Sequence, residues 1–234
     1  VLALQQHGAA PSCGHLRRRF QRAFARPVVD AGGKRACQQF LVGRQFARIR
    51  RRWRRVEGGG LHGLDDWCAG DARGRLIPLT IVPLWDADLA AQEVRRCADK
   101  GSFAIAFVEN PYPLGFPSIH DKGRFWDPFF AACQETESTV CMHIGSSSKM
   151  PSTSPDAPGI ISSTLTFQNA MGSLLDFIFS GTLERFPSLV LAYSEGQVGW
   201  MPYILERADK LWEERSDNSF GTWLKVPPSS FIPN

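Results

Sequence analysis

Four polar side chains that can bind a metal ion or transfer a proton follow short apolar runs of the sequence. They are Asp86, Glu109, His143 and Glu195. A residue at the carboxyl end of a buried parallel strand faces the mouth where α/β proteins place their active sites. Carboxylates and imidazoles are also the groups that a divalent cation or a general acid/base pair requires. The spacing therefore predicts that these side chains converge on one rim of a sheet.

Each of the four also has a structural interpretation, and the residues alone leave both open. His143 ends a β-branched, apolar run and precedes a glycine-serine loop, but a single histidine is often a satisfied structural residue. Asp86 fits the N-cap of a following helix. Glu109 could pair with a loop backbone or an arginine. His120 lies in the loop after Glu109, where it could cover a substrate.

The elements that would position these residues form four strand–helix units in succession. Such a series implies parallel strands joined by right-handed crossovers. It fits either a doubly wound sheet or part of a barrel, and no Gly-x-Gly-x-x-Gly follows a strand to support a dinucleotide fold. The predicted strands are 76–84, 104–108, 138–143 and 189–193, and the predicted helices are 87–100, a helix capped by Asp127 with Pro128 at its first position, one ending near Gly181, and 201–214.

Composition indicates an ordinary soluble chain. Hydrophobic residues make up 43% and charged residues 21% of the 234, and no apolar run approaches the ~18 to 20 residues that span a bilayer. We expect a cytoplasmic protein without a membrane partner. The six cysteines show no Cys-x-x-Cys pairing, so neither a zinc ribbon nor a redox dithiol is indicated.

The charge divides the chain into two parts, which we interpret as a basic segment 1–60 and a folded domain 61–234. The first carries 14 Lys and Arg against Asp30 and Glu57, a balance of +12, and the rest has a balance of −8. Three interpretations of residues 1–60 stay open: a basic arm that contacts nucleic acid, a disordered extension, and translation of a GC-rich gene in a shifted frame. A nucleic-acid partner is the least favoured of the three.

Several blocks of the domain resemble the amidohydrolase-related proteins, the branch of the amidohydrolase superfamily that includes aminocarboxymuconate-semialdehyde and resorcylate decarboxylases. The resemblance covers about residues 65–228. The blocks are RLIPLTIVPL at 75–84, ENPYPLGFPSIH at 109–120, WDP at 126–128, CMHIGSSS at 141–148 and SEGQVGWMPYILERAD at 194–209.

The resemblance implies a metal-dependent (β/α)8 barrel of the TIM type that hydrolyses or decarboxylates a small organic substrate. It implies that His143 is the fifth-strand metal ligand, with zinc as the first expectation and manganese as the second. Glu195 falls where many relatives carry a catalytic sixth-strand histidine, so we assign it the catalytic role. We expect loops 109–124 and 145–163 to form the pocket wall, with Glu109, His120 and Ser146 as substrate contacts.

The chain departs from the family pattern in ways that bear on activity. No His-x-His or Asp-x-His occurs in residues 1–75, and no block supplies the eighth-strand aspartate. We therefore expect a partial barrel of about four units, strands three to six of the family, with doubtful metal binding and weak or no activity. Unclosed sheet edges predict self-association. The alternative function is a non-catalytic α/β scaffold with a basic nucleic-acid-binding arm.

Overall fold

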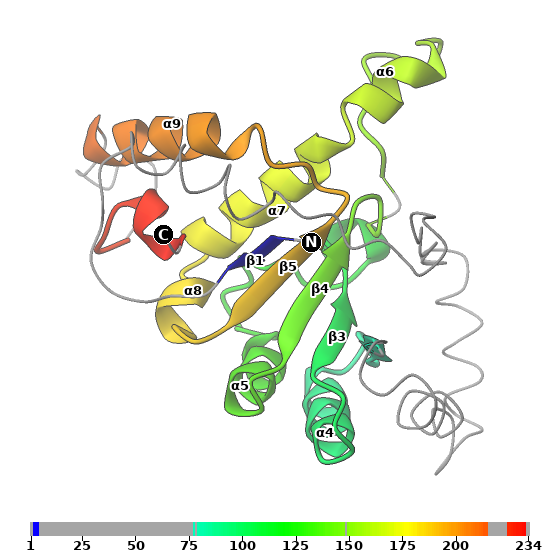
Figure 1. Ribbon diagram of the computed structural model, residues 1–234, viewed down its shortest axis with the longest axis vertical. Helices are drawn as coiled ribbons and strands as arrows, with labels where there is room; N and C mark the ends of the chain where they lie inside the picture. Colours follow the sequence, from blue (N-terminus) through cyan, green and yellow to red (C-terminus); the bar gives the residue numbers. More distant parts are fainter. Residues whose placement is uncertain (1, 5–76, 78, 148, 215–223, 233–234) are drawn as a thin grey trace, which may run out of the picture.

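A computed structural model describes residues 2–4, 77, 79–147, 149–214 and 224–232 of the chain. Its centre is a five-stranded sheet in the order β1-β5-β4-β3-β2, in which β2 to β5 are parallel and β1 runs antiparallel to β5 (Figure 1). The strands are β1 (Leu2–Leu4), β2 (Leu79–Ile81), β3 (Ala104–Phe107), β4 (Thr139–His143) and β5 (Val190–Ser194). The four parallel strands confirm the predicted α/β class.

A helix follows each parallel strand, as the four-unit pattern predicts. Figure 1 shows α4 and α5 next to each other, and α7 passing close to β5. The helical segments are α4 (Ala87–Ala98), η1 (Tyr112–Leu114), α5 (Asp127–Glu135), α6 (Gly159–Thr164), α7 (Phe167–Phe179), α8 (Thr182–Arg185), α9 (Met201–Glu214) and η2 (Pro228–Phe231). None of the described helices is both long and apolar enough to cross a membrane.

Alternate residues of the strands form a helix-packed face, because side chains along a strand point to opposite sides. Phe107 stacks on Phe129 of α5 with ring centroids 5.1 Å apart, and the Tyr193 hydroxyl donates to Ser173 Oγ of α7. This face is deeply buried and forms the core with the helices. Its strand residues are Thr80, Ile105, Phe107, Val140, Met142, Leu191 and Tyr193.

The intervening residues form a second face, which we call the cleft face. Most of its side chains are small and half-buried, and it ends at His143 on β4 and Ser194 on β5, which are partners in the register. Its members are Leu79, Ile81, Ala104, Ala106, Thr139, Cys141, His143, Val190, Ala192 and Ser194. The same four parallel strands thus supply a core on one side and a candidate site on the other.

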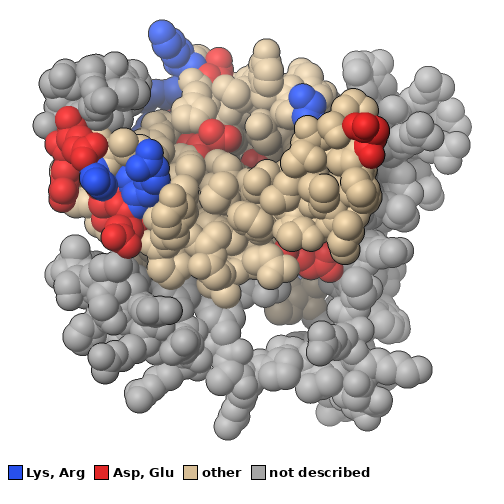
Figure 2. Space-filling view, turned by 90° about the horizontal axis from the view of Figure 1, so that it is seen from above, with Lys and Arg blue, Asp and Glu red and all other residues tan. Residues whose placement is uncertain are grey.

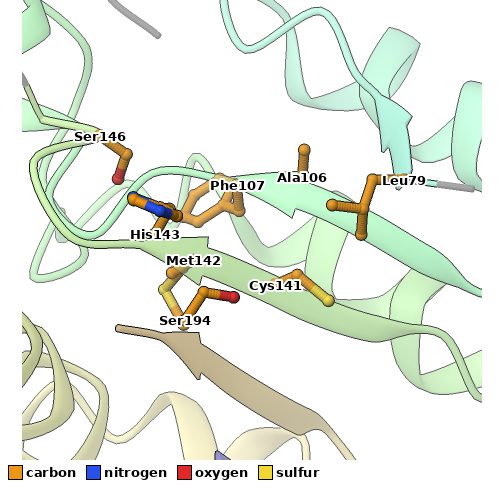
Figure 3. A pocket seen from close by; sticks show the side chains of 8 residues that line it. All are labelled: Leu79, Ala106, Phe107, Cys141, Met142, His143, Ser146 and Ser194. Atoms are coloured by element: carbon orange, nitrogen blue, oxygen red, sulfur yellow. The ribbon is translucent and has the colours of Figure 1, made fainter. Parts of the chain in front are cut away.

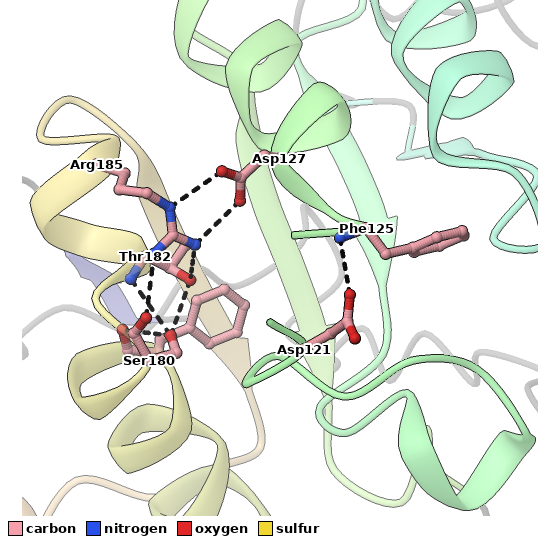
Figure 4. Close-up of polar contacts among 7 residues, drawn as sticks. Asp121, Phe125, Asp127, Ser180, Thr182 and Arg185 are labelled. Carbon is pink, nitrogen blue, oxygen red and sulfur yellow. Dashed lines mark hydrogen bonds and ion pairs between the residues drawn. The ribbon is translucent and has the colours of Figure 1, made fainter. Parts of the chain in front are cut away.

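Asp127 connects α5 to α8 and does not cap its own helix, so the predicted N-cap was wrong. Helix α5 begins at Asp127, and the residue before it makes no side-chain cap hydrogen bond. The Asp127 carboxylate accepts from Arg185 Nε at 3.1 Å and Nη2 at 3.0 Å, and Arg185 Nη1 donates to the Ser180 carbonyl (Figure 4). The two-pronged contact with Arg185 therefore directs the Asp127 carboxylate toward α8.

Two strands differ from the sequence prediction. Strand β2 covers only part of 76–84, because Pro83 lacks an N–H and the chain turns there, with Asp86 N–H bonded to the Pro83 carbonyl. Strand β1 pairs Leu2–Leu4 with residues 191–193 of β5 and was not predicted. The remainder of segment 1–60, with its arginine runs, lies outside the described residues, and self-association stays a prediction.

Candidate functional site

His143 stands at the end of β4 on the cleft face, held in one orientation by a backbone carbonyl. Its Nδ1 lies 2.8 Å from the Ile144 carbonyl oxygen. A carbonyl can only accept, so Nδ1 carries a hydrogen and Nε2 is the ring atom that faces the Glu195 carboxylate. Metal-binding histidines are commonly fixed in this way by a hydrogen bond from their other nitrogen.

Glu195 reaches His143 because the chain turns sharply after β5. An extended strand would send Glu195 to the helix-packed side, since Ser194 before it lies on the cleft face. Glu195 instead has a φ of +60°. Its Oε2 lies 3.4 Å from His143 Nε2, and its side chain is 51% exposed. The structure therefore brings together the predicted metal ligand and the predicted catalytic carboxylate.

A shallow cleft bordered by His143 lies over residues of β2, β3 and β4, with Ser194 of β5 at its edge (Figure 3). It has an aliphatic and sulfur-containing floor, with hydroxyl groups from Ser146 and Ser194 near the imidazole. Ser146 Oγ accepts the Glu109 N–H at 2.9 Å, so its own hydrogen can be donated elsewhere. The lining residues are Leu79, Ala106, Phe107, Cys141, Met142, His143, Ser146 and Ser194.

Glu109 is placed differently from the other predicted site residues. It is 1% exposed and is not among the residues that line the cleft. Burial raises the pKa of its carboxyl to about 7, although N–H groups of residues 145–147 and the Asn169 amide pull it in the opposite direction. Within the described part of the chain neither carboxylate oxygen completes a hydrogen bond of good geometry. The Glu109 carboxyl therefore lies buried near residues 145–147 and Asn169 and does not border the cleft.

Asp86 and His120 form hydrogen bonds with residues other than His143 and Glu195. Asp86 Oδ1 accepts from the N–H groups of Asp88 and Leu89, both at 3.0 Å, which confirms the helix-cap interpretation. His120 Nε2 lies 2.9 Å from Asp176 Oδ1 and so ties loop 109–124 to α7. A substrate contact by His120 stays a prediction.

Sequence reasoning did not select Ser194, Cys141, Leu79 or Ala106 as lining residues. Strand parity could have found Cys141, which lies two residues before His143 on the same face. Glu109 lies two residues after Phe107, whose ring packs on α5, so strand parity places Glu109 on the helix-packed side.

Two potential metal donors lie together at this site. His143 Nε2 and the Glu195 carboxylate are donors of suitable chemistry at suitable separation. Among the residues the structure describes, no group of three or more His, Cys, Asp and Glu is gathered at one point. Protein sites for zinc use three or four such ligands, so this pair fits a cation only with further donors.

Comparison with protein families assigns the chain to a family. The profile of the Amidohydro_2 family, described as amidohydrolase, matches residues 38–229. The chain belongs to the amidohydrolase family. Members of this family generally use a divalent metal. The match begins well before residue 65 and includes the arginine run at 48–55.

A solved structure of an amidohydrolase shares the fold of this chain, and a second one is less similar. An amidohydrolase from Mycobacterium avium subspecies paratuberculosis K-10 matches with a TM-score of 0.56 at 19% identity, over 73% of this chain and 46% of that one. A Staphylococcus aureus protein provisionally assigned as an amidohydrolase matches with a TM-score of 0.49 at 17% identity, over 73% and 54%. The chain thus spans about half the length of these relatives. No curated protein matches it.

Proposed function

We propose that the chain carries part of the site of a metal-dependent hydrolase or decarboxylase that acts on a small organic substrate. The proposal rests on the two contacts that the ring nitrogens of His143 make. Its Nδ1 hydrogen is fixed on the Ile144 carbonyl while Nε2 is directed toward the Glu195 carboxylate, 3.4 Å away. An imidazole nitrogen and a carboxylate oxygen at this separation can share a proton or a cation.

His143 would hold the ion through Nε2. Zinc is the first expectation because imidazole is one of its preferred ligands, and manganese is the second because carboxylate oxygens favour it. Such an ion, when bound, would polarise a carbonyl or carboxylate oxygen of the substrate or lower the pKa of a water molecule toward about 7.

Glu195 and the two serines would act directly on the substrate. The exposed Glu195 carboxylate is within reach of His143 and can accept a proton and return it. The hydroxyl groups of Ser146 and Ser194 border the cleft and can donate to a substrate oxygen. Leu79, Ala106 and Cys141 would contact the apolar part of the molecule.

The surface around the sheet's carboxyl end supports a small, largely uncharged substrate. Figure 2 views the molecule from that end, and most described side chains in view are neither basic nor acidic, with charged groups gathered mainly toward the margin. The described residues that line the cleft include no Lys or Arg. Such a surface does not favour a polyanion.

Two protein donors hold a cation less firmly than three or four, so we expect weak binding and low turnover from the described residues. An equilibrium titration of the full chain with Mn²⁺, followed by electron paramagnetic resonance of the free ion, suits this range. We expect His143→Ala to weaken binding by at least about 100-fold, since it removes a direct ligand. His120→Ala is the matched control and should leave the affinity within about twofold. Equal affinity in His143→Ala and the unaltered chain would refute the proposal.

A further inference from the structure

The turn that follows β5 has an unusual backbone. Glu195 and Gln197 both adopt left-handed φ values, +60° and +61°, although neither is glycine. Residues with side chains rarely adopt this region, and such conformations persist where surrounding structure enforces them. Gly196, between them, is not in the left-handed region. A backbone requirement for positive φ therefore does not explain the glycine.

The space around Gly196 does explain it. A Cβ at this position would lie 2.7 Å from Ala170 Cβ on α7 and 3.2 Å from Tyr193 Cβ on β5. Both neighbouring atoms are Cβ atoms, which cannot rotate away as the end of a long side chain can. The turn therefore rests on α7 only because residue 196 has no side chain and residue 170 has a single methyl group.

Trp200 holds the same turn from another side. Its indole Nε1–H donates to the Gly196 carbonyl oxygen at 2.7 Å, a short hydrogen bond for this pair of groups. Trp200 lies just before α9, which begins at Met201. The Gly196 peptide is thus fixed on α7 by contact and on the start of α9 by a hydrogen bond.

We propose that Ala170, Gly196 and Trp200 form a seat that sets the Glu195 carboxylate against His143. The three act as positioning residues, and the inference rests on the proposed joint role of Glu195 and His143. The seated turn reverses the chain at Glu195 and returns its carboxylate to the cleft face, 3.4 Å from His143 Nε2. A methyl group at position 196 pushes the turn away from α7 and carries the carboxylate with it.

A pair of glycine variants in the full chain tests the seat. Gly196→Ala should weaken Mn²⁺ binding, followed by electron paramagnetic resonance, by about 10-fold, the range seen when support behind a ligand is lost. Gly199→Ala is the matched control, because nothing lies within 4 Å of a Cβ there. It should change the affinity by no more than about twofold. Trp200→Phe keeps the ring, removes the N–H and should weaken binding by about threefold.

A second substitution separates displacement of the carboxylate from general damage to the fold. Ala170→Gly combined with Gly196→Ala removes one of the two clashing methyl groups, so it should regain most of the lost affinity. This double variant also carries the test if Gly196→Ala alone does not fold in a thermal unfolding control.

Glu195→Gln distinguishes failure of the seat from failure of the proposed function. If Glu195→Gln leaves Mn²⁺ affinity unchanged, the joint role of Glu195 and His143 is wrong and the seat has no function to serve. If Glu195→Gln weakens binding but Gly196→Ala does not, the seat alone is refuted. It is also refuted if folded Gly196→Ala loses affinity and the added Ala170→Gly restores none of it.

Discussion

The two faces of the sheet use the same strands for different purposes. On the helix-packed face Ile105, Met142 and Leu191 are at most 1% exposed. On the cleft face the neighbouring residues Cys141 and His143 are half-buried and small or polar. Alternation along each strand separates the two sets, except that Phe107 and Met142 also border the cleft. For the other strand residues, stability and chemistry can therefore be altered separately, by choosing residues of one parity or the other.

The largest expected effect is a loss of packing on the helix-packed face. Phe130 is 1% exposed, and its ring meets Phe107 and Phe177. Phe130→Ala should lower the free energy of unfolding by about 3–5 kcal/mol in urea titrations. Phe103, 51% exposed, is the matched control, and its alanine variant should cost less than about 1 kcal/mol. Equal losses would contradict the contrast in packing.

Glu109 places an ionisable group on the helix-packed side, and stability should depend on pH through it. Burial raises the pKa of its carboxyl from 4.5 to about 7. Between these values the unfolded chain releases a proton that the folded chain retains, so stability falls as the pH rises through this window. The loss is complete above about pH 7 and should reach about 2–3 kcal/mol.

Glu109→Gln should remove this component of the pH dependence. The variant should lose less stability than the unaltered chain between pH 4.5 and pH 7.5, measured by urea unfolding at each pH. Groups elsewhere titrate alike in both proteins and cancel in the difference. Identical pH profiles for the two would show that the Glu109 carboxyl is not buried as described.

Substitution of two cysteines, one on each side of the sheet, compares the faces more directly. Cys133 of α5 is fully buried, and Cys141 lies on the cleft face. Cys133→Ser buries a hydroxyl group in an apolar setting and should cost about 2 kcal/mol. Cys141→Ser should cost less than about 1 kcal/mol, because its surroundings admit water. Thermal unfolding measures both, and a larger loss for Cys141→Ser would reverse the assignment of the faces.

The smallest expected effect concerns the link between α5 and α8 behind the helix-packed face. The Arg185 and Asp127 side chains are 26% and 24% exposed, whereas those of the Arg95–Glu135 pair are 44% and 60% exposed. Arg185→Lys loses the two-pronged contact and should cost about 1 kcal/mol in chemical unfolding. Arg95→Lys should cost no more than about 0.3 kcal/mol. Indistinguishable losses would mean that Arg185 acts as an ordinary surface charge.

Much of the fold could be predicted because its signals are local. Apolar periodicity and flanking prolines give β3, β4, β5 and the helices α4, α5, α7 and α9 within a few residues of their observed bounds, whereas α6 and α8 were not predicted. Strand β1 could not be predicted, since three residues carry no period and their partner lies at 191–193. The Asp127–Arg185 pair is likewise distant in sequence, so a local N-cap rule misplaced Asp127.

The candidate site could be predicted in part for a similar reason. Strand-end reasoning placed His143 and Glu195 on one rim, and they lie 3.4 Å apart. It did not foresee the left-handed turn at Glu195, because no glycine stands there to mark it. It also gave Glu109 an outward direction, whereas Glu109 shares its parity with the buried Phe107. The sequence shows where along a strand a residue lies. The side of the sheet to which its side chain points follows only from the alternation along the whole strand.

The most direct measurement is anomalous X-ray diffraction from crystals of the full chain soaked in Zn²⁺, recorded on both sides of the zinc absorption edge. A cation held on the cleft face predicts an anomalous peak at bonding distance from His143 Nε2, about 2.0–2.1 Å, with the Glu195 carboxylate beside it. Crystals of His143→Ala should lack that peak. A peak of equal height in both crystals, or well-diffracting unaltered crystals with zinc bound only elsewhere, would contradict a metal site at His143.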